Sequence, residues 1–175
     1  TARLVLRPLA PADAAAVARG AGDPRVARYL LAVPSPYPIA LARRWVLHRI
    51  GWWDAGRGLT LAIARAEVPD ALIGTVSLRR YPRDRRAELG YWLSASAWGQ
   101  GLATEAARAI VALGFDGLGL ARVYAKVFTG NLGSIAVLTK LGLEREGVLR
   151  RHIRQGGRLL DVAIYGVLRD DWRAR

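Results

Sequence analysis

The sequence predicts a mixed α/β fold, with one mixed sheet flanked by helices. Two features of the chain carry this prediction. Segments in which apolar and polar residues alternate, as in strands, occur among segments with the apolar period of a helix. Glycine and proline turns join neighbouring strand segments into hairpins. The length of 175 residues suits one domain with one core, so we assign residues 1–175 to a single domain.

The first third of the chain predicts one strand and three helices. Residues 1–9 alternate like a strand that Pro8 ends. Residues 11–19 open with Pro and are alanine-rich, as a helix start can be, and a short helix is expected over residues 23–31. Prolines then exclude a helix until residues 39–54. One face of this third helix is expected to carry Leu41, Trp45, His48 and Trp52.

Three strands and the most regular helix are expected in the middle of the chain. Strands over residues 59–66 and 71–79 form a hairpin, because Val68-Pro69-Asp70 between them is a turn signal. A third strand covers residues 86–93. Residues 101–118 predict a helix that glycines end. The apolar side of that helix is expected to hold Leu102, Ala106, Ile110 and Leu113.

The last third predicts three more strands and one helix. A strand over residues 121–128 is followed by a helix over 131–141 and a strand over 143–149. Gly156-Gly157 is a hairpin turn, after which residues 159–168 form the closing strand. The predicted order is therefore β-α-α-α-β-β-β-α-β-α-β-β.

Composition excludes several classes of site. The chain has no cysteine, so it contains no disulfide framework, thiolate metal ligand or cysteine nucleophile. His48 and His152 lack the spacing of a zinc site, and we expect no metal. No apolar run approaches the roughly 18 residues of a membrane span, and residues 1–20 lack the apolar core of a signal sequence. We expect a soluble, cytoplasmic protein without a membrane partner.

The formal net charge of +13 is almost entirely arginine, with Lys126 and Lys140 as the only lysines. One explanation is a genome rich in G and C, whose codons favour arginine, alanine and glycine. The other is attraction to a polyanion such as nucleic acid, the ribosome surface or cofactor phosphates. The arginines are scattered rather than gathered in one tract, which favours the first explanation. Nucleic acid is not the expected partner, and proximity to the ribosome stays open.

The segment at residues 98–104 predicts an anion site. A strand runs into a short loop with glycines, and the loop opens directly into a helix. Glycines let a ligand approach the backbone, and the unpaired N–H groups of the first helical turn favour an anion such as a pyrophosphate. A dinucleotide fingerprint and a P-loop are both absent. A tight strand–helix turn without a ligand is the alternative.

A second polar pair follows the next strand. The segment T-G-N-L-G-S opens a helix that ends in K-L-G-L. Asn131 by itself is explained as an N-cap, and Ser134 as a first-turn polar residue. Their distance after the glycine loop makes the arrangement more specific than either residue is.

These motifs together resemble the GNAT superfamily of N-acetyltransferases, in particular its RimJ/RimL-like branch. They cover nearly the whole chain, in the order L-V-L-R-P-L, E-L-G-Y-W-L, W-G-Q-G-L-A-T-E-A, N-x-x-S, L-G-L, G-V-L-R and D-V-A-I-Y-G-V-L. The resemblance implies a mixed sheet of about seven strands flanked by about four to five helices. Its two central parallel strands, at residues 88–93 and 121–128, would splay apart around the pantetheine of acetyl-CoA. By analogy with relatives it also implies a homodimer.

The resemblance further implies the contacts to acetyl-CoA, the expected cosubstrate. The family's loop pattern Q/R-x-x-G-x-G/A maps onto residues 98–103, with Trp98 in place of Gln or Arg. Asn131 matches the asparagine that hydrogen-bonds the pantetheine, and strand N–H groups near Leu93 would meet the acyl oxygen. Lys140 is better explained as a solvated charge than as a 3′-phosphate ligand. The expected contacts are Leu93, Ser94, Ala95, Trp98, Gly99, Gln100, Gly101, Leu102, Ala103, Thr104, Asn131 and Ser134.

The implied chemistry is direct transfer of an acetyl group to a primary amine in a ternary complex. An amine that is mostly protonated at neutral pH needs a base to accept a proton. Glu88 stands at the strand position where many relatives carry a glutamate, so it is the candidate base. The alternative is a surface carboxylate paired with Arg85 or Arg86.

The acid that protonates the leaving thiolate departs from the family pattern. Many members carry a tyrosine at the position of Leu138 here, and Ser134 is the substitute that the RimL-like pattern offers. The glutamate that RimL-like proteins can carry after G-V-L-R is absent around Ile153, which puts ribosomal-protein N-termini in doubt as the substrate.

Aromatic residues are interpreted chiefly as core or pocket wall. This holds for Tyr91, Trp92 and Tyr165. An exposed tryptophan in the third predicted helix would line the acceptor site, while core packing is favoured for two of the three there. Those three are Trp45, Trp52 and Trp53.

Several functions remain to be distinguished. The favoured acceptor is a protein N-terminal α-amine, and a small-molecule amine such as an antibiotic or a polyamine comes second. The positive charge argues mildly against polyamines. A non-catalytic acyl-CoA-binding module would bind the cofactor without turnover, and a nucleic-acid-binding domain is suggested by charge alone.

Overall fold

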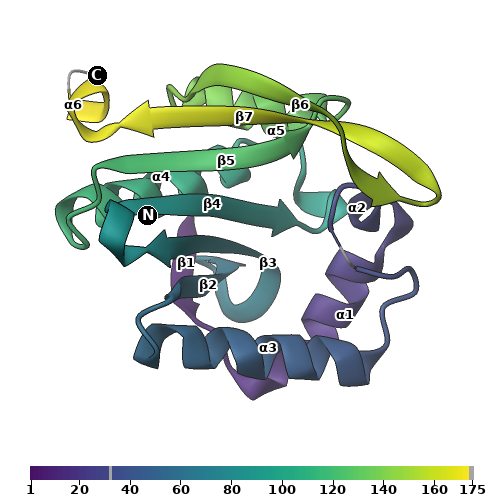
Figure 1. The fold of residues 1–175 in the computed structure, drawn as a ribbon. Helices are drawn as coiled ribbons and strands as arrows, with labels where there is room; N and C mark the ends of the chain where they lie inside the picture. Colours follow the sequence, from purple (N-terminus) through teal and green to yellow (C-terminus); the bar gives the residue numbers. More distant parts are fainter. Residues whose placement is uncertain (32, 174–175) are drawn as a thin grey trace.

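The computed structural model describes residues 1–31 and 33–173. A seven-stranded sheet runs through them in the order β1-β2-β3-β4-β5-β7-β6 (Figure 1). Neighbouring strands are antiparallel except β4 and β5, which are parallel. The predicted mixed α/β sheet is confirmed. The strands are β1 (Leu4–Pro8), β2 (Gly58–Arg65), β3 (Val68–Tyr81), β4 (Arg86–Leu93), β5 (Arg122–Phe128), β6 (Glu144–Gln155) and β7 (Arg158–Leu168).

Helices cover both faces of the sheet (Figure 1). The first three helices pack on one face and the next two on the other, and each layer is filled by its own buried apolar cluster. A short sixth helix, which was not predicted, follows β7. The helices are α1 (Ala14–Gly22), α2 (Pro24–Ala27), α3 (Ile39–Asp54), α4 (Leu102–Asp116), α5 (Leu132–Lys140) and α6 (Arg169–Arg173).

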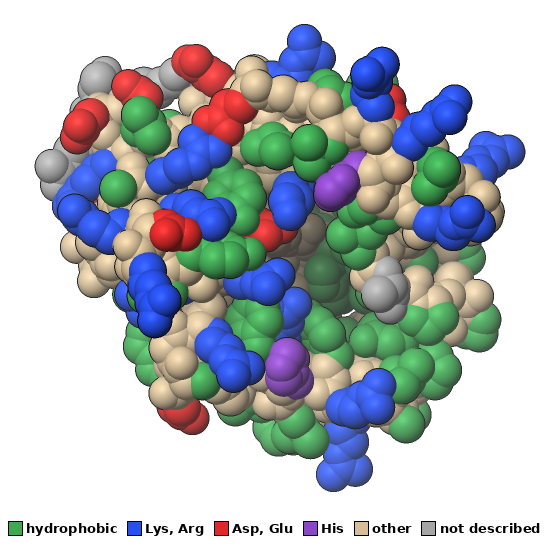
Figure 2. Space-filling view, viewed as in Figure 1, with side chains coloured by type: hydrophobic (Ala, Val, Ile, Leu, Met, Phe, Trp, Pro, Cys, Tyr) green, Lys and Arg blue, Asp and Glu red, His purple; other side chains and the backbone are tan. Residues whose placement is uncertain are grey.

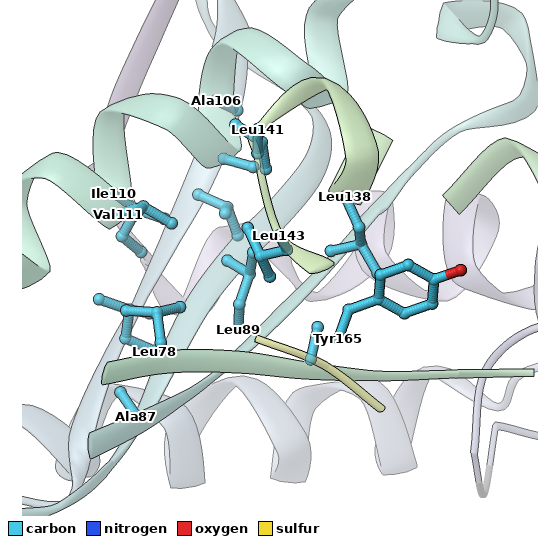
Figure 3. Close-up of a cluster of buried hydrophobic side chains, with 14 of the residues drawn as sticks. Leu78, Ala87, Leu89, Ala106, Ile110, Val111, Leu138, Leu141, Leu143 and Tyr165 are labelled. Carbon is cyan, nitrogen blue, oxygen red and sulfur yellow. The ribbon is translucent and has the colours of Figure 1, made fainter. Parts of the chain in front are cut away.

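The larger apolar cluster holds α4 and α5 against the sheet. Figure 3 shows Ala106 and Ile110 of α4 converging with Leu138 of α5 on strand residues such as Leu78 and Leu89. Full burial of one such side chain is worth roughly 1.5–3 kcal/mol. The predicted apolar side of α4 is confirmed at its first three positions, whereas Leu113 is exposed.

The two parallel strands diverge after a short paired stretch. β4 and β5 pair only from Arg86 with Arg122 to Glu88 with Tyr124. The hydrogen bonds of β4 to β3 explain which groups are then left over. The Ser94 N–H donates to the Ile73 carbonyl at 2.8 Å, and antiparallel pairing alternates from residue to residue.

Every second residue of β4 therefore turns its N–H and C=O away from β3 and toward β5. These residues are Leu89, Tyr91 and Leu93, and the pairing register gives them no partner in β5. The unpaired edges of the two strands border a gap in the middle of the sheet.

The predicted Gly156-Gly157 turn is confirmed, whereas the turn of the first hairpin and the end of β6 in the second hairpin are wrong. Val68-Pro69-Asp70 lies inside β3, and the turn is one step earlier at Ala66 and Glu67. The register shifts so that Ala64 faces Leu72 while Arg65 faces Val68, and this irregularity accommodates Pro69 in an edge region of the ladder. β6 extends to Gln155, beyond its predicted end. Its last residues are arginine-rich and exposed and show no apolar pattern, but they pair with β7 after a second register shift.

The buried face of α3 also differs from the predicted one. Ala42 and Val46 are fully buried, whereas Leu41 and His48 are exposed. Small residues allow the helix to approach α1 and β2 closely. The bulky Trp45 and Trp52 are only partly buried at the edge of that contact.

Candidate active site

A cavity of about 750 Å³ occupies the gap between β4 and β5. Its walls come from both faces of the sheet. On one side they are the loop before α4, the first turn of α4 and the start of α5. On the other side they are parts of α1, α2, α3 and the β6–β7 hairpin. The cavity therefore connects the two layers of the fold through the opened sheet.

The glycine loop presents unpaired backbone to this cavity. Gly99 and Gly101 have φ angles of 74° and 75°, which glycine adopts readily. A Cβ built on Gly99 would meet no heavy atom within 4 Å, so the space beside it is open. The first bond within α4 runs from the Glu105 N–H to the Gly101 carbonyl at 3.1 Å, which leaves the N–H groups of residues 102–104 as the usual unpaired donors of a helix start.

Two arginines that the sequence analysis missed brace this loop. Arg3 donates to the Gln100 carbonyl at 3.0 Å, and Arg65 donates to the Gln100 side chain. Glu105 in the first turn of α4 is held by Thr1 and Arg3. The hydrogen bond from Thr1 and those from Arg3 lower the pKa of Glu105 to about 2, although partial burial opposes them. The carboxylate therefore stays ionised, and its ion pair with Arg3 offsets the negative charge that would otherwise repel a bound anion.

Trp98 closes the end of β4. Its indole N–H donates to the Leu93 carbonyl at 2.8 Å, which is one of the groups turned toward the gap. The residue that departs from the family's loop pattern therefore satisfies the backbone of the splayed strand. The N–H predicted to meet an acyl oxygen lies within residues 93–95. That of Ser94 is bonded to Ile73, whereas that of Leu93 points to the gap.

Asn131 and Ser134 meet at the start of α5. The Asn131 Oδ1 accepts from the Ser134 N–H at 3.1 Å, so the asparagine is an N-cap. This bond uses only the side-chain oxygen, and both residues line the cavity.

Tyr91 lies behind Ser134. Its hydroxyl is 2.7 Å from the Ser134 Oγ and donates to the Ser134 carbonyl at 3.1 Å. Burial raises the pKa of Tyr91 to about 12, despite the serine hydrogen bond, so the phenol stays protonated at neutral pH. The sequence analysis treated Tyr91 as pocket wall. Side chains alternate along a strand, so the spacing of two residues from Leu89 and from Leu93 predicts that Tyr91 is on the same side of β4 as these two leucines, which is the α5 side.

Glu88 lies on the opposite wall of the cavity, where the strands begin to part. The Tyr124 hydroxyl donates to its Oε2 at 3.2 Å. Burial, with hydrogen bonding to Tyr81 and the charge of Glu88, raises the pKa of Tyr124. Within the described residues no ion pair joins Glu88 to Arg85 or Arg86, and Arg86 pairs with Asp84 at 3.0 Å.

The cavity brings together most of the predicted site. Three predicted contacts lie outside its lining: Ser94, Ala95 and Gln100, of which the first two line a separate small pocket near α1. Lys140 does line the cavity. The predicted residues in the lining are Glu88, Leu93, Trp98, Gly99, Gly101, Leu102, Ala103, Thr104, Asn131 and Ser134.

Leu138, at the position where the family resemblance implies a tyrosine, is completely buried. Figure 3 shows it beside the ring of Tyr165 in the apolar cluster, and it also lines the cavity. A leucine supplies no proton. Ser134 lies one helical turn before Leu138, on the same side of α5, and its side chain also lines the cavity.

The far side of the cavity is aromatic and cationic. Trp45 lines it, whereas Trp53, the exposed tryptophan of α3, does not. Arg28, Arg49 and Lys126 line it as well, and Glu88 is the one acid in the lining formed by the described residues. In Figure 2, blue Lys and Arg side chains gather around a hollow in this face of the molecule.

No group of acids and histidines suited to a metal ion occurs within the residues that the structure describes. The helices of that same part are too short or too polar to cross a bilayer.

The fold and the cavity define a class of protein: an open α/β sheet, split at its parallel pair, that can hold an extended anionic ligand across its middle. A family model described as an acetyltransferase (GNAT) domain matches residues 3–144. The chain belongs to this family and is an N-acyltransferase.

Known relatives agree with this assignment. The chain is 33% identical over 170 residues to the uncharacterized N-acetyltransferase YoaA of Bacillus subtilis, covering 97% of this chain and 95% of that one. It is 32% identical over 102 residues to the ribosomal-protein-serine acetyltransferase of Escherichia coli, covering 58% and 57%.

The RimL ribosomal L7/L12 α-N-protein acetyltransferase, solved with coenzyme A, has the same fold, with a TM-score of 0.86 at 21% identity over 96% of this chain and 95% of that chain. The RimJ/RimL-like resemblance is confirmed.

Proposed function

We propose that the protein transfers the acetyl group of acetyl-CoA to a primary amine by direct transfer in a ternary complex. The observation that carries the proposal is the single cavity that joins the glycine loop to Glu88 through the split sheet. A thioester at one end and an amine at the other could meet only in such a passage. The effective molarity gained by holding both reactants accounts for a large share of the catalysis.

The residues present fit the cofactor. The open space beside Gly99 and the unpaired N–H groups of the first turn of α4 suit a pyrophosphate. The unpaired edges of β4 and β5 suit an amide-bearing arm that hydrogen-bonds like a strand. Bound acetyl-CoA would supply the thioester. Asn131 and the Leu93 N–H would orient it, and the latter would stabilise negative charge on the carbonyl oxygen.

Glu88 is the proposed base. It would accept a proton from the attacking amine, directly or through water, while the Tyr124 hydroxyl holds its carboxylate in place. The new N–C bond forms as the C–S bond breaks. Ser134 would then give its hydroxyl proton to the thiolate and regain one through Tyr91 or water.

The favoured acceptor is a protein N-terminal α-amine. The support is the similarity to the ribosomal-protein-serine acetyltransferase, together with a pKa near 8 that makes α-amines easier to deprotonate than alkyl amines. A small-molecule amine is the second candidate. On the α1–α3 side, bulky side chains line the cavity and leave less room for a polypeptide acceptor.

The test is thiol release from acetyl-CoA with a panel of peptides and small amines. We expect release that depends on one acceptor class and falls about a hundredfold in Glu88→Gln. Glu67→Gln, at the exposed β2–β3 turn, is the matched control and should keep full activity. If the wild type released no thiol with any acceptor while coenzyme A still raised its melting temperature, the protein would instead be a non-catalytic acyl-CoA-binding module.

A further inference from the structure

Arg49 places a buried positive charge in the acceptor half of the cavity. It extends from α3, lines the cavity and is half-buried. Its guanidinium lies 3.7 Å from the centre of the Trp52 ring and 5.3 Å from that of Trp45. Contact with the two indoles restricts the motion of the guanidinium, which reduces the entropy lost when it binds a ligand.

The Arg49 guanidinium makes no hydrogen bond to another of the described residues. Its Nε is buried and has no hydrogen-bond partner among the described residues. Within residues 1–31 and 33–173, neither Arg49 nor its neighbour Arg79 forms an ion pair. Burial, and then the charge of Arg79, lower the pKa of Arg49. A buried charge without a counter-ion is costly, and an anion would relieve that cost.

The sheet register places this charge beside the proposed base. Arg79 of β3 is directly opposite Glu88 of β4, so both side chains start from the same face of the sheet. Arg49 approaches Arg79 from α3, which covers that face. The charge is therefore on the amine side of the split sheet, across from the glycine loop that suits the pyrophosphate.

A cationic amine without a negative group would be repelled from the acceptor half of the cavity. Arg28, Arg49 and Lys126 line this side, against Glu88 as the one acid of the described lining. An amine that also carries a negative group would be attracted, and the surrounding positive charge would lower its ammonium pKa toward the neutral, reactive form.

We propose that the acceptor is an amine that also carries an anionic group, a carboxylate or a phosphate. Arg49 binds this group in the cavity while the amine faces Glu88, and the exposed Arg79, outside the cavity lining, adds positive charge beside Arg49. This rests on the proposed acetyl transfer and narrows its substrate class. A guanidinium is planar and carries paired N–H donors, which suits bidentate recognition of such a group.

The test uses acceptor pairs that differ only in charge. One pair is a C-amidated dipeptide with Asp or Asn at its second position, and the other is 2-aminoethyl phosphate and ethanolamine. We expect at least a tenfold higher kcat/KM for the anionic member of one pair, since a charged hydrogen bond is worth about 1.5–3 kcal/mol. The pair that responds tells whether the group is a peptide carboxylate or a phosphate.

Variants then assign the preference to this cluster. Arg49→Gln should remove the tenfold preference, measured as the ratio of kcat/KM for the anionic and the neutral member of the same pair. Arg43→Gln, exposed on the same helix and outside the cavity, is the control and should keep it. If Arg49→Gln does not fold, Arg79→Gln on the exposed end of β3 gives the same comparison.

A binding measurement separates this inference from the proposed reaction. The N-acetylated Asp and Asn dipeptides and N-acetyl-2-aminoethyl phosphate are titrated by calorimetry into the protein loaded with coenzyme A. Anion binding that depends on Arg49, without any thiol release, would support the anion subsite and overturn the reaction. Equal turnover and equal binding of charged and neutral members would overturn the inference and leave the reaction standing.

Discussion

Tyr91 of β4 and Ser134 of α5 are in polar contact at the gap in the sheet, with 2.7 Å between the Tyr91 hydroxyl and the Ser134 Oγ. The phenol has one proton and two serine oxygens within reach. When it donates to the Oγ, the serine proton is directed elsewhere, toward the cavity. Tyr91 is therefore a positioning residue for the proposed acid.

This predicts a specific kinetic result for Tyr91→Phe. Loss of the hydroxyl should lower kcat about tenfold with little change in the KM for acetyl-CoA, because the serine is misdirected while binding surfaces persist. The double variant with Ser134→Ala should be no slower than Ser134→Ala alone. Steady-state kinetics checks both, and Tyr165→Phe, a buried tyrosine outside the cavity lining, is the control. Additive losses in the double variant would contradict the coupling.

Asp13 joins β1 to the segment before α1. Arg7 of β1 donates to both carboxylate oxygens at 2.9 and 2.8 Å, and the Ala10 N–H adds a third bond at 2.8 Å. The carboxylate is 6% exposed. Burial alone would raise the pKa of Asp13, but the hydrogen bonds from Arg7 and Ala10 and the charge of Arg7 lower it below its ordinary 3.8.

A depressed carboxylate pKa contributes stability above the unfolded value and loses it as pH falls through the folded value. Asp13→Asn should therefore cost about 2 kcal/mol of unfolding free energy at pH 7, and much less in strong acid, where the wild-type carboxyl is also protonated. Urea unfolding at pH 7 and in strong acid checks this, with the exposed Asp54→Asn as control. An equal loss at both would show that the pattern of hydrogen-bond acceptors, rather than the charge, is what matters at this position.

At the scale of elements, the sequence predicts what depends on local period and misses what depends on neighbours. The β4 and α4 segments were placed within a residue or two, because alternation, glycine and apolar spacing are local signals. The turn before β3 was misplaced, because a proline can enter a ladder where a register shift removes the need for its N–H. The buried face of α3 differs from the predicted one, because the small Ala42 contacts the sheet more closely than the tryptophans can.

The candidate site follows the same division. Glu88 and Asn131 came from family motifs in the sequence, but their partners did not. Tyr124 reaches Glu88 across the parallel pair, and Tyr91 reaches Ser134 across the gap, over separations of 36 and 43 residues. No local pattern encodes such contacts, since they exist only after β4 and β5 lie side by side.

At the scale of the whole molecule, the split sheet divides the work between two layers. The α4–α5 layer supplies unpaired N–H groups and suits the cofactor, while the α1–α3 layer supplies cations and aromatic rings and suits the acceptor. The gap costs the fold the ladder hydrogen bonds of β4 beyond Glu88. The Trp98 indole recovers one of them at Leu93, and a pantetheine arm could satisfy others.

A ligand that spans this gap should stabilise the whole fold. Coenzyme A at a hundred times its Kd adds about 2.7 kcal/mol, which corresponds to a melting-temperature rise of roughly 5 to 10 °C for a chain of this size. Gly99→Ala should lose most of this rise, because the added methyl group enters the open space beside the loop. The φ angle of 74° adds a separate folding cost of about 1 kcal/mol.

Gly119→Ala separates these two effects. Gly119 has a φ of 63° and equally open surroundings but lies outside the cavity lining, so the same methyl group should cost similar stability there. Thermal unfolding of both variants, with and without coenzyme A, gives the comparison. We expect both apo proteins to melt lower than the wild type, and only Gly99→Ala to lose the ligand-induced rise. An undiminished rise in Gly99→Ala would mean that the pyrophosphate is bound away from this loop, and the two-layer division would then have to be drawn elsewhere in the cavity.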